Sequence, residues 1–314
     1  MVMAHTLVQL LARRFDELYL VAPKATLPVA QRMAEIDQVV QIDIGHGTLG
    51  LGARWRLGRE IAKYGCGTAF VLPNSWKSAL LPLMAGVPRR IGWHGEVRFG
   101  LLTDRRCDSE SYPLMIERFM ALADPDGALP DQPYPEPSLS VDLKNRAGCL
   151  SRLDLNTDGI VALCPGAEFG AAKKWPAPAY AELAEALIAK GKTIWLMGSP
   201  ADAADCEKIA ERVPGVRNLA GRTSLLDAID LLSICEQIVS NDSGLMHIGC
   251  ALGIPTMGIF GSTSPGFTPP LGEHAQVAEI DLACRPCFQR QCPLSHLNCL
   301  RRLTPAEVLS KLAV

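Results

Sequence analysis

The residues best suited to chemistry form the turn SNDSG (240–244), which lies between an apolar strand pattern and a helical pattern. A helix that begins here presents unpaired backbone N–H groups and the positive end of its dipole, which favours an anionic ligand. Asp242 or Ser243 could instead simply cap the helix, but a cap needs only one such side chain and this turn has several. His247 lies about one turn later. The helix N-terminus predicts a neutral imidazole there, either packed in the core or in contact with a ligand.

A second polar loop, PGAEFGAAKKWP (165–176), follows another predicted strand. Gly166 and Gly170 allow backbone amides to approach a ligand closely, and Lys173 and Lys174 add cations beside them. The combination fits a phosphate, although a surface turn with solvated lysines has the same composition. A third turn, GSTSP (261–265), again supplies amides and hydroxyls after a strand, so the three loops predict one phosphate cradle.

Two common nucleotide-binding motifs are missing from the sequence. There is no G-x-G-x-x-G after a strand and no G-x-x-x-x-G-K-[ST]. The first absence disfavours a nicotinamide enzyme and the second disfavours a P-loop ATPase. No Asp-x-Asp metal motif accompanies the three loops either.

The chain contains eleven cysteines, four of them clustered in the segment CRPCFQRQCPLSHLNC. In a cytosolic protein such a cluster suggests a metal site more than disulfides, but its spacing matches no common zinc knuckle. We therefore favour reduced thiols in an ordered loop, with metal binding as the alternative, for Cys284, Cys287, Cys292 and Cys299. The other seven lie mostly in apolar segments and are predicted to be buried free thiols: Cys66, Cys107, Cys149, Cys164, Cys206, Cys235 and Cys250.

Helical and strand patterns alternate along the chain and must position these residues. In the first half we predict strands at 17–22, 38–43 and 67–72 and helices at 1–14, 26–34, 50–64, 75–85 and 111–123, with an irregular basic stretch at 88–100. In the second half we predict strands at 158–166, 192–198, 236–240 and 255–261 and helices at 178–190, 202–212, 224–235 and 244–253, the helix at 224 being opened by a Ser cap.

This alternation is typical of parallel sheets built from βαβ units. The proline-rich segment 124–138 has no apolar period and predicts a linker between a domain at 1–123 and a domain at 139–314. We expect an α/β protein with two doubly wound domains facing a cleft, and ligands beyond the carboxyl ends of the strands. A doubly wound domain usually opens with its central strand, whereas this chain opens on a helix. The first domain is therefore expected to lack that strand and its turn.

Composition narrows the possible classes of protein. The 314 residues include 31 Lys and Arg and 33 Asp and Glu, a net charge of −2, with 48% apolar and 20% charged residues. These are globular proportions, and the near-neutral balance argues against bulk electrostatic binding to nucleic acid. No apolar run reaches the ~18 residues of a transmembrane helix, and the first residues lack the charge order of a secretory signal. We expect a cytoplasmic protein.

Several segments together carry a resemblance to a known family. They are PGAEFGAAKKWP, NDSGLMHIGCALGIP, FGSTSPGFTPPLG, CRPCFQRQCPLSHLNCL, GHGTLGLGARWRLGREI, VLPNSWKSALLPLMAGVPRRIGWHGEVRFGLL and YPLMIERF. The chain resembles, over essentially its whole length, the ADP-heptose:lipopolysaccharide heptosyltransferases of glycosyltransferase family 9, most closely those that add the second heptose of the inner core. The resemblance implies a GT-B fold, in which the second domain binds the donor and the first binds the acceptor.

The resemblance also implies roles for individual residues. Lys173 in the loop of Gly166 would contact the diphosphate of ADP-heptose, and Asp242 would hold heptose hydroxyls. Ser243 and Gly244 would offer amides to the phosphates with His247 nearby, and Asp202 would hold the ribose. The acceptor, heptosyl-Kdo2-lipid A at the cytoplasmic face of the inner membrane, would face Asn74, Ser75, Lys77, Arg89, Arg90 and Arg98. No cofactor is implied.

The implied reaction is an inverting displacement, in which an acceptor hydroxyl attacks the anomeric carbon and ADP leaves. Family members carry the expected general base, an Asp in a Gly-Asp turn, just before the segment that begins here with Met1; that turn is absent from this sequence. Amides, a lysine and a helix N-terminus would take the place of a metal cation. The alternatives are addition of the first heptose, another GT-B nucleotide-sugar transferase, or a nucleotide-sugar binder without catalytic activity.

Overall fold

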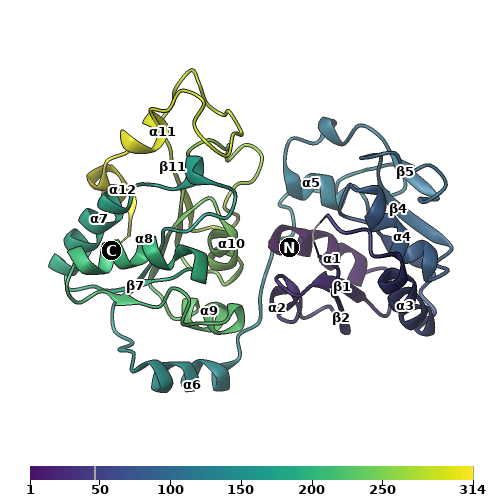
Figure 1. Ribbon diagram of the computed structural model, residues 1–314, viewed down its shortest axis with the longest axis horizontal. Helices are drawn as coiled ribbons and strands as arrows, with labels where there is room; N and C mark the ends of the chain where they lie inside the picture. Colours follow the sequence, from purple (N-terminus) through teal and green to yellow (C-terminus); the bar gives the residue numbers. More distant parts are fainter. Residues whose placement is uncertain (46, 314) are drawn as a thin grey trace. The chain divides into compact units, whose positions relative to one another are not determined.

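The computed structural model describes residues 1–45 and 47–313. The chain divides into two compact units, and the boundary between them falls between Pro135 and Glu136, inside the proline-rich segment (Figure 1). The first unit runs from purple to blue in Figure 1 and the second from teal to yellow. Within the described residues, none of the helices is long and apolar enough to cross a membrane.

The second unit is built on one six-stranded parallel sheet in the order β8-β7-β6-β9-β10-β11. Its strands are β6 (Ile160–Cys164), β7 (Thr193–Leu196), β8 (Arg217–Asn218), β9 (Gln237–Asn241), β10 (Thr256–Ile259) and β11 (Ala275–Ala278). The chain order reverses between β6 and β9, where Leu163 pairs with Val239. In a doubly wound sheet, such a switch point is where a ligand crevice forms.

Helices cover both faces of this sheet, so every residue of its central strands β6 and β9 is buried, and β6 is apolar throughout. The helices are α6 (Leu143–Leu153), α7 (Ala177–Ala189), α8 (Ala203–Arg212), α9 (Leu225–Leu232), α10 (Gly244–Ala251), α11 (Asn298–Arg301) and α12 (Pro305–Lys311). Ser224 caps α9 as predicted, because its hydroxyl accepts a hydrogen bond from the Asp227 amide at 3.1 Å.

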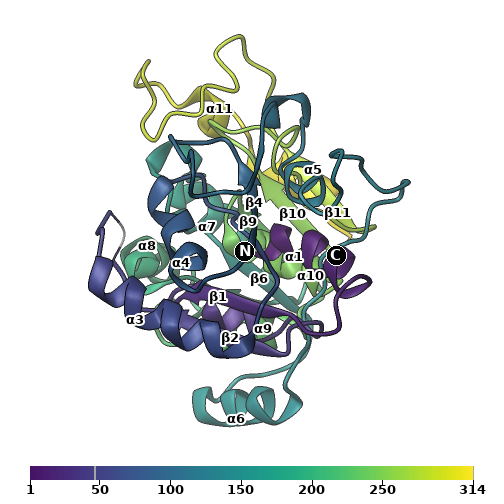
Figure 2. The ribbon, with the colours of Figure 1, turned by 90° about the vertical axis from the view of Figure 1, so that its right-hand side faces the viewer.

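The first unit contains two separate parallel sheets, one of β1 and β2 and one of β3, β4 and β5 (Figure 2). Their bounds are β1 (Tyr19–Pro23), β2 (Gln38–Ile42), β3 (Thr68–Phe70), β4 (Arg89–Trp93) and β5 (Asp104–Arg106). Val21, Val40 and Ala69 nevertheless pack against one shared apolar cluster. The two sheets match the two halves of the second unit's sheet on either side of β6. No strand among the described residues fills the equivalent of β6.

The helices of the first unit are α1 (His5–Ala12), α2 (Leu27–Ala30), α3 (Leu51–Ile61), α4 (Trp76–Met84) and α5 (Met115–Met120). Helices α3 and α4 pack closely because Gly58 carries no side chain. A Cβ at position 58 would lie 2.9 Å from the Cβ of Met84.

The stretch 88–100, predicted to be irregular, contains β4. Ile91 and Trp93 are buried, and Gly92 packs so closely that a Cβ there would lie 2.9 Å from the Val71 carbonyl oxygen. Arg89, Arg90 and Gly92 interrupt the apolar pattern, so the sequence gives no clear strand signal here. The strands β5, β8 and β11 and the helices α6, α11 and α12 were not predicted; each of them is short or polar.

Candidate functional site

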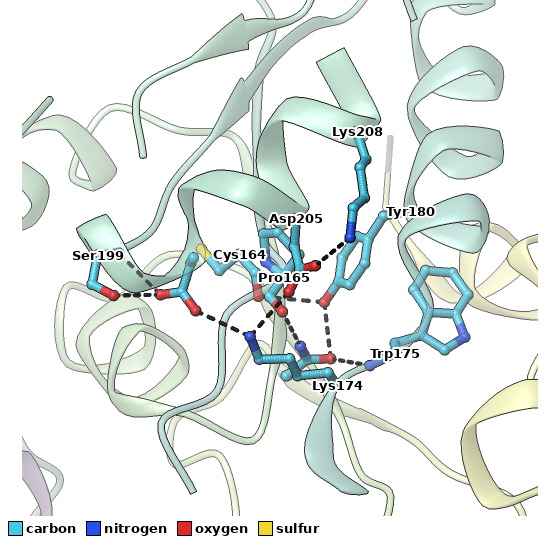
Figure 3. A network of polar contacts seen from close by, with 10 residues as sticks. Cys164, Pro165, Lys174, Trp175, Tyr180, Ser199, Asp205 and Lys208 are labelled. Atoms are coloured by element: carbon cyan, nitrogen blue, oxygen red, sulfur yellow. Dashed lines mark hydrogen bonds and ion pairs between the residues drawn. The ribbon is translucent and has the colours of Figure 1, made fainter. Parts of the chain in front are cut away.

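The loops that follow β6, β9 and β10 meet at the carboxyl edge of the second unit's sheet. Asn241, the last residue of β9, is completely buried and fixes the loop after β6 to this edge. Its Nδ2 donates to the Pro165 carbonyl at 2.6 Å, and its Oδ1 accepts from the Trp175 amide and the Tyr180 hydroxyl, each at 3.1 Å (Figure 3). Asn241 is therefore a positioning residue, a role that the sequence alone did not reveal.

Three loops converge on the carboxylate of Asp242. The Nζ of Lys173, from the loop after β6, lies 2.6 Å from Asp242 Oδ2. The hydroxyl of Thr263, from the loop after β10, donates to the same oxygen at 2.6 Å. The side chains of Asp242 and Lys173 are only 4% and 14% exposed, so water screens their charges weakly and a nearby anion would interact strongly with the lysine. The predicted convergence of the three loops is thus present.

The N-terminus of α10 carries no side-chain cap. Asp242 is engaged by Lys173, and the Ser243 hydroxyl lies 3.1 Å from that of Ser240 instead of capping the helix. The capping alternative is therefore not realised. With no side chain bonded to them, the first amides of α10 suit an anionic ligand.

His247 lies within this helix and is partly exposed. Burial lowers its pKa to about 4, although the nearby Asp242 carboxylate acts in the opposite direction. The lowered pKa favours the predicted neutral imidazole, and burial is its largest cause.

The second lysine of the Lys173-Lys174 pair points to a different set of partners. Lys174 Nζ lies 3.0 Å from Asp205 and 3.5 Å from Asp202, so it ties the loop after β6 to the start of α8 (Figure 3). Asp202 also accepts from the amide and hydroxyl of Ser199 at 3.1 and 2.7 Å. A Cβ at Gly166 would come within 2.4 Å of the Asp202 carboxylate, so only glycine fits there without a shift. The spacing Asp202-x-x-Asp205 was the available signal for this contact.

The cysteine-rich loop supports two of the three site loops. The Ala172 amide donates to the Arg290 carbonyl at 3.1 Å, and the Phe288 amide donates to the Ser262 carbonyl at 2.8 Å. The Arg285 side chain donates to the carbonyls of Gly261 and Thr263 at 2.6 and 3.1 Å. This segment therefore stabilises the cradle from outside, which the sequence analysis did not predict.

All eleven cysteines are free. Cys299 is buried and Cys284, Cys287 and Cys292 are half-buried, and over residues 1–45 and 47–313 no group of three or more His, Cys, Asp or Glu side chains is arranged to hold a metal ion. The other seven cysteines were predicted to be buried. This is correct for Cys149, Cys164, Cys206 and Cys235 and wrong for Cys107, which is exposed. Cys66 and Cys250 are half-buried.

In the first unit, three of the predicted acceptor residues lie together beyond the carboxyl end of β3. Asn74 is exposed, Ser75 precedes α4, and Lys77 donates from Nζ to the Gly47 carbonyl at 2.7 Å. The loop after β4 is tied to them, because the Glu96 amide donates to the Asn74 carbonyl at 3.0 Å.

Of the three predicted acceptor arginines, only Arg98 is shown beside Asn74, with its Nη2 3.5 Å from Asn74 Oδ1. Arg98 is completely buried and donates to the backbone carbonyls of Pro73 at 2.9 Å and of Trp93, so it holds the loops in place. Its role in this geometry is positioning rather than acceptor contact.

Arg89 and Arg90 lie at the other end of the strand. Arg89 pairs in register with Thr68 at the amino end of β3, whereas Asn74 lies in the loop beyond the carboxyl end of that strand. Arg90 donates to the carbonyls of Val87 and Leu101, each at 2.6 Å. Arg89 and Arg90 were grouped with Asn74 by the family resemblance, and the structure places both at the start of β4.

Comparisons with known proteins cover both units. A family model for glycosyltransferase family 9 (heptosyltransferase) matches residues 54–298. The chain is 38% identical over 326 aligned residues to lipopolysaccharide heptosyltransferase 2 of Escherichia coli K12, covering 99% of this chain and 94% of that protein. The solved structure of E. coli ADP-heptose lps heptosyltransferase II superposes with a TM-score of 0.87 at 37% identity, over 99% of this chain and 93% of that one. The predicted α/β GT-B fold is thereby confirmed.

A more distant solved structure has the same fold. It is E. coli heptosyltransferase WaaC with ADP-2-deoxy-2-fluoro heptose, which matches with a TM-score of 0.66 at 18% identity over 98% of this chain and 95% of that one. At this identity the likeness concerns the fold alone.

Proposed function

This chain belongs to glycosyltransferase family 9, the heptosyltransferase family, and from that premise we propose that it performs the heptosyltransferase II reaction. It would move L-glycero-D-manno-heptose from ADP-heptose to the first heptose of the lipopolysaccharide inner core. The observation that carries this proposal is the 38% identity to a heptosyltransferase 2 over 99% of the chain. The converging loops around Asp242 are the independent support, because they suit a diphosphate.

The donor would bind at the carboxyl edge of the second unit's sheet. Lys173 and the amides of Ser243 and Gly244 would hold the diphosphate, while Asp242 would bind heptose hydroxyls and Asp202 the ribose. As the anomeric carbon–oxygen bond breaks, negative charge grows on the departing ADP. A buried lysine and an uncapped helix N-terminus are preorganised to stabilise that charge, commonly the largest electrostatic contribution to such catalysis.

Binding of the donor would change the partners of Lys173. In the free protein its ammonium is paired with Asp242 at 2.6 Å, and the diphosphate would share or replace that contact. Thr263, which donates to the same Asp242 oxygen at 2.6 Å, would keep the carboxylate in place meanwhile. Asp242 would then be free to accept hydrogen bonds from the sugar.

The acceptor would lie against Asn74, Ser75 and Lys77 of the first unit. The resemblance assigns the general base to an Asp in a Gly-Asp turn, numbered before residue 1, at the end of a strand. The unfilled position between β1 and β3 is where such a strand would fit. Removal of the acceptor proton by a carboxylate would contribute roughly 10²- to 10⁴-fold to the rate.

The acceptor sugar is attached to lipid A, so this reaction would occur at the cytoplasmic face of the inner membrane. We therefore propose a cytoplasmic protein that reaches the membrane peripherally. A second candidate is a nucleotide-sugar binder without transferase activity, which the converging loops around Asp242 would also suit.

A transfer assay with matched acceptors separates these candidates. The protein is incubated with ADP-heptose and either heptosyl-Kdo2-lipid A or Kdo2-lipid A, and the products are analysed by mass spectrometry. We expect heptose addition only to the acceptor that already carries one heptose. Addition to Kdo2-lipid A would instead indicate transfer of the first heptose. Donor binding without transfer to either acceptor, also after an N-terminal strand ending in Gly-Asp is added, would leave the binder as the function.

A further inference from the structure

We propose that the loops at the carboxyl ends of β2, β3 and β4 form a surface that docks on an anionic lipid bilayer. We call this surface the apolar rim and define it as Leu49, Leu51, Trp55, Trp76, Val97 and Phe99. The inference rests on the proposed function, because a lipid-embedded acceptor is what would bring the protein to a bilayer.

Exposed apolar side chains are concentrated in this part of the chain. Of the twelve large hydrophobic side chains that are exposed within residues 1–45 and 47–313, eight lie between residues 49 and 99. Val97 and Phe99 are the extreme cases in this region, at 73% and 65% exposed. Large apolar groups that remain exposed together are typical of a protein or membrane contact surface.

A fixed backbone conformation of the loop keeps Val97 and Phe99 exposed. Arg98, between them in sequence, is completely buried and donates to the carbonyls of Pro73 and Trp93. The anchored arginine fixes the backbone, so the side chains on either side project outward. A buried guanidinium thus holds two apolar groups in water.

Hydrogen bonds connect the three loops into one surface. Lys77 donates to the Gly47 carbonyl at 2.7 Å, which joins the loop after β2 to the start of α4. The Trp76 amide donates to the Glu96 carboxylate at 3.0 Å, which joins α4 to the loop after β4. Helix α3, which carries the exposed Trp55, packs on α4 (Figure 2).

Charge selects an anionic bilayer as the partner. Residues 44–106 contain ten Lys and Arg and three Asp and Glu. Arg54 and Arg98 are buried, and Arg89 and Arg90 lie at the other end of the strand, so six cations remain against three acids. The Arg59 guanidinium lies 5.3 Å from the Trp55 ring centre, and that of Arg105 lies 3.8 Å from the Phe99 ring centre. An aromatic ring next to a guanidinium suits the headgroup layer, where the ring contacts acyl chains and the cation contacts lipid phosphate.

Vesicle sedimentation tests the surface directly. The full chain is mixed with vesicles of phosphatidylethanolamine and phosphatidylglycerol, or with neutral phosphatidylcholine vesicles. We expect binding to the anionic vesicles only, and about a tenfold loss of that binding in a V97S/F99S variant. Leu143→Ser is the matched control, because Leu143 is 63% exposed on the other unit, and it should bind as wild type does. Equal binding of wild type and V97S/F99S, or equal binding to neutral vesicles, would overturn the proposal.

A second measurement separates this proposal from the transferase assignment. Transfer is followed with a deacylated, water-soluble acceptor and with the same acceptor embedded in anionic vesicles. V97S/F99S should equal wild type on the soluble acceptor and fall about tenfold on the embedded one. Loss on neither acceptor would refute the apolar rim while leaving the transferase function intact. Absence of transfer by wild type to both acceptors would refute the function, and the sedimentation result would then decide the apolar rim alone.

Discussion

Replacing Lys173 with Met tests the donor site most directly. The substitution keeps the length of the side chain but removes the ammonium, which lies 2.6 Å from Asp242 Oδ2. Asp242 would then remain buried with the Thr263 hydroxyl as its remaining side-chain donor. The variant should therefore lose both nucleotide affinity and stability, for different reasons.

The two losses can be estimated separately. A charge-assisted contact to the diphosphate contributes about 1.5–3 kcal/mol, so ADP affinity should fall about 10- to 150-fold. Removing one member of a buried ion pair costs about 3–5 kcal/mol of stability. Because 14% of the Lys173 side chain is exposed, we expect about 2–3 kcal/mol here.

A double variant distinguishes the contact of Lys173 with the diphosphate from its pairing with Asp242. In K173M/D242N no buried charge is left unpaired, and Thr263 can still donate to the Asn side-chain oxygen. The free energy of unfolding should return to within about 1 kcal/mol of the wild-type value, whereas ADP affinity should stay low. Lys192→Met is the control, because it breaks the exposed pair with Glu236 and should cost no more than about 1 kcal/mol.

Isothermal titration calorimetry with ADP and urea unfolding are the two measurements. Wild-type ADP affinity in K173M would show that the lysine does not bind the diphosphate. Recovery of affinity in the double variant would show that the lysine acts only by neutralising Asp242. Either outcome would refute the assignment.

Three further predictions concern the rest of the molecule. Arg98→Ala should lower the urea midpoint and raise the KM for the acceptor while ADP affinity is unchanged, since it removes the arginine donor of the Trp93 carbonyl at a cost of about 1–3 kcal/mol. The Pro73 carbonyl would keep the Ser78 hydroxyl as a donor, and a normal KM would exclude the positioning role. Burial alone would raise the pKa of Asp227, but hydrogen bonds from Ser224, Cys149 and Asn145 hold it well below its usual value. The folded state thus binds fewer protons than the unfolded state, so this stabilisation is present above pH ~4 and is lost as the pH falls further. Asp227→Asn should therefore flatten the dependence of the unfolding free energy on pH below ~4. An unchanged slope would contradict this role of Asp227. An added N-terminal strand ending in Gly-Asp should raise both the urea midpoint and heptose transfer, and the same strand ending in Gly-Asn should raise only the midpoint; equal turnover without the strand would mean that another residue is the base.

The sequence by itself determined the architecture and the convergence of the three polar turns. Alternating helix and strand patterns predict parallel sheets, and the carboxyl ends of parallel strands share one edge. The polar turns after β6, β9 and β10 therefore had to meet, which brings Lys173, Asp242 and Thr263 together although up to 90 residues separate them. Strand order and loop position are local enough, and regular enough, for residue patterns to specify them.

Only the tertiary structure decided which side chain of each polar turn faces the site. Nothing local distinguishes Lys173, which contacts Asp242, from its neighbour Lys174, which contacts Asp202 and Asp205. Likewise, Arg98 is buried because carbonyls 5 and 25 residues earlier in the chain accept its hydrogen bonds, and no local sequence pattern predicts such partners. Arginine and lysine have the same appearance in a sequence whether they bind a ligand or a backbone. Their role is fixed by long-range packing, which determines the groups that lie within hydrogen-bonding distance.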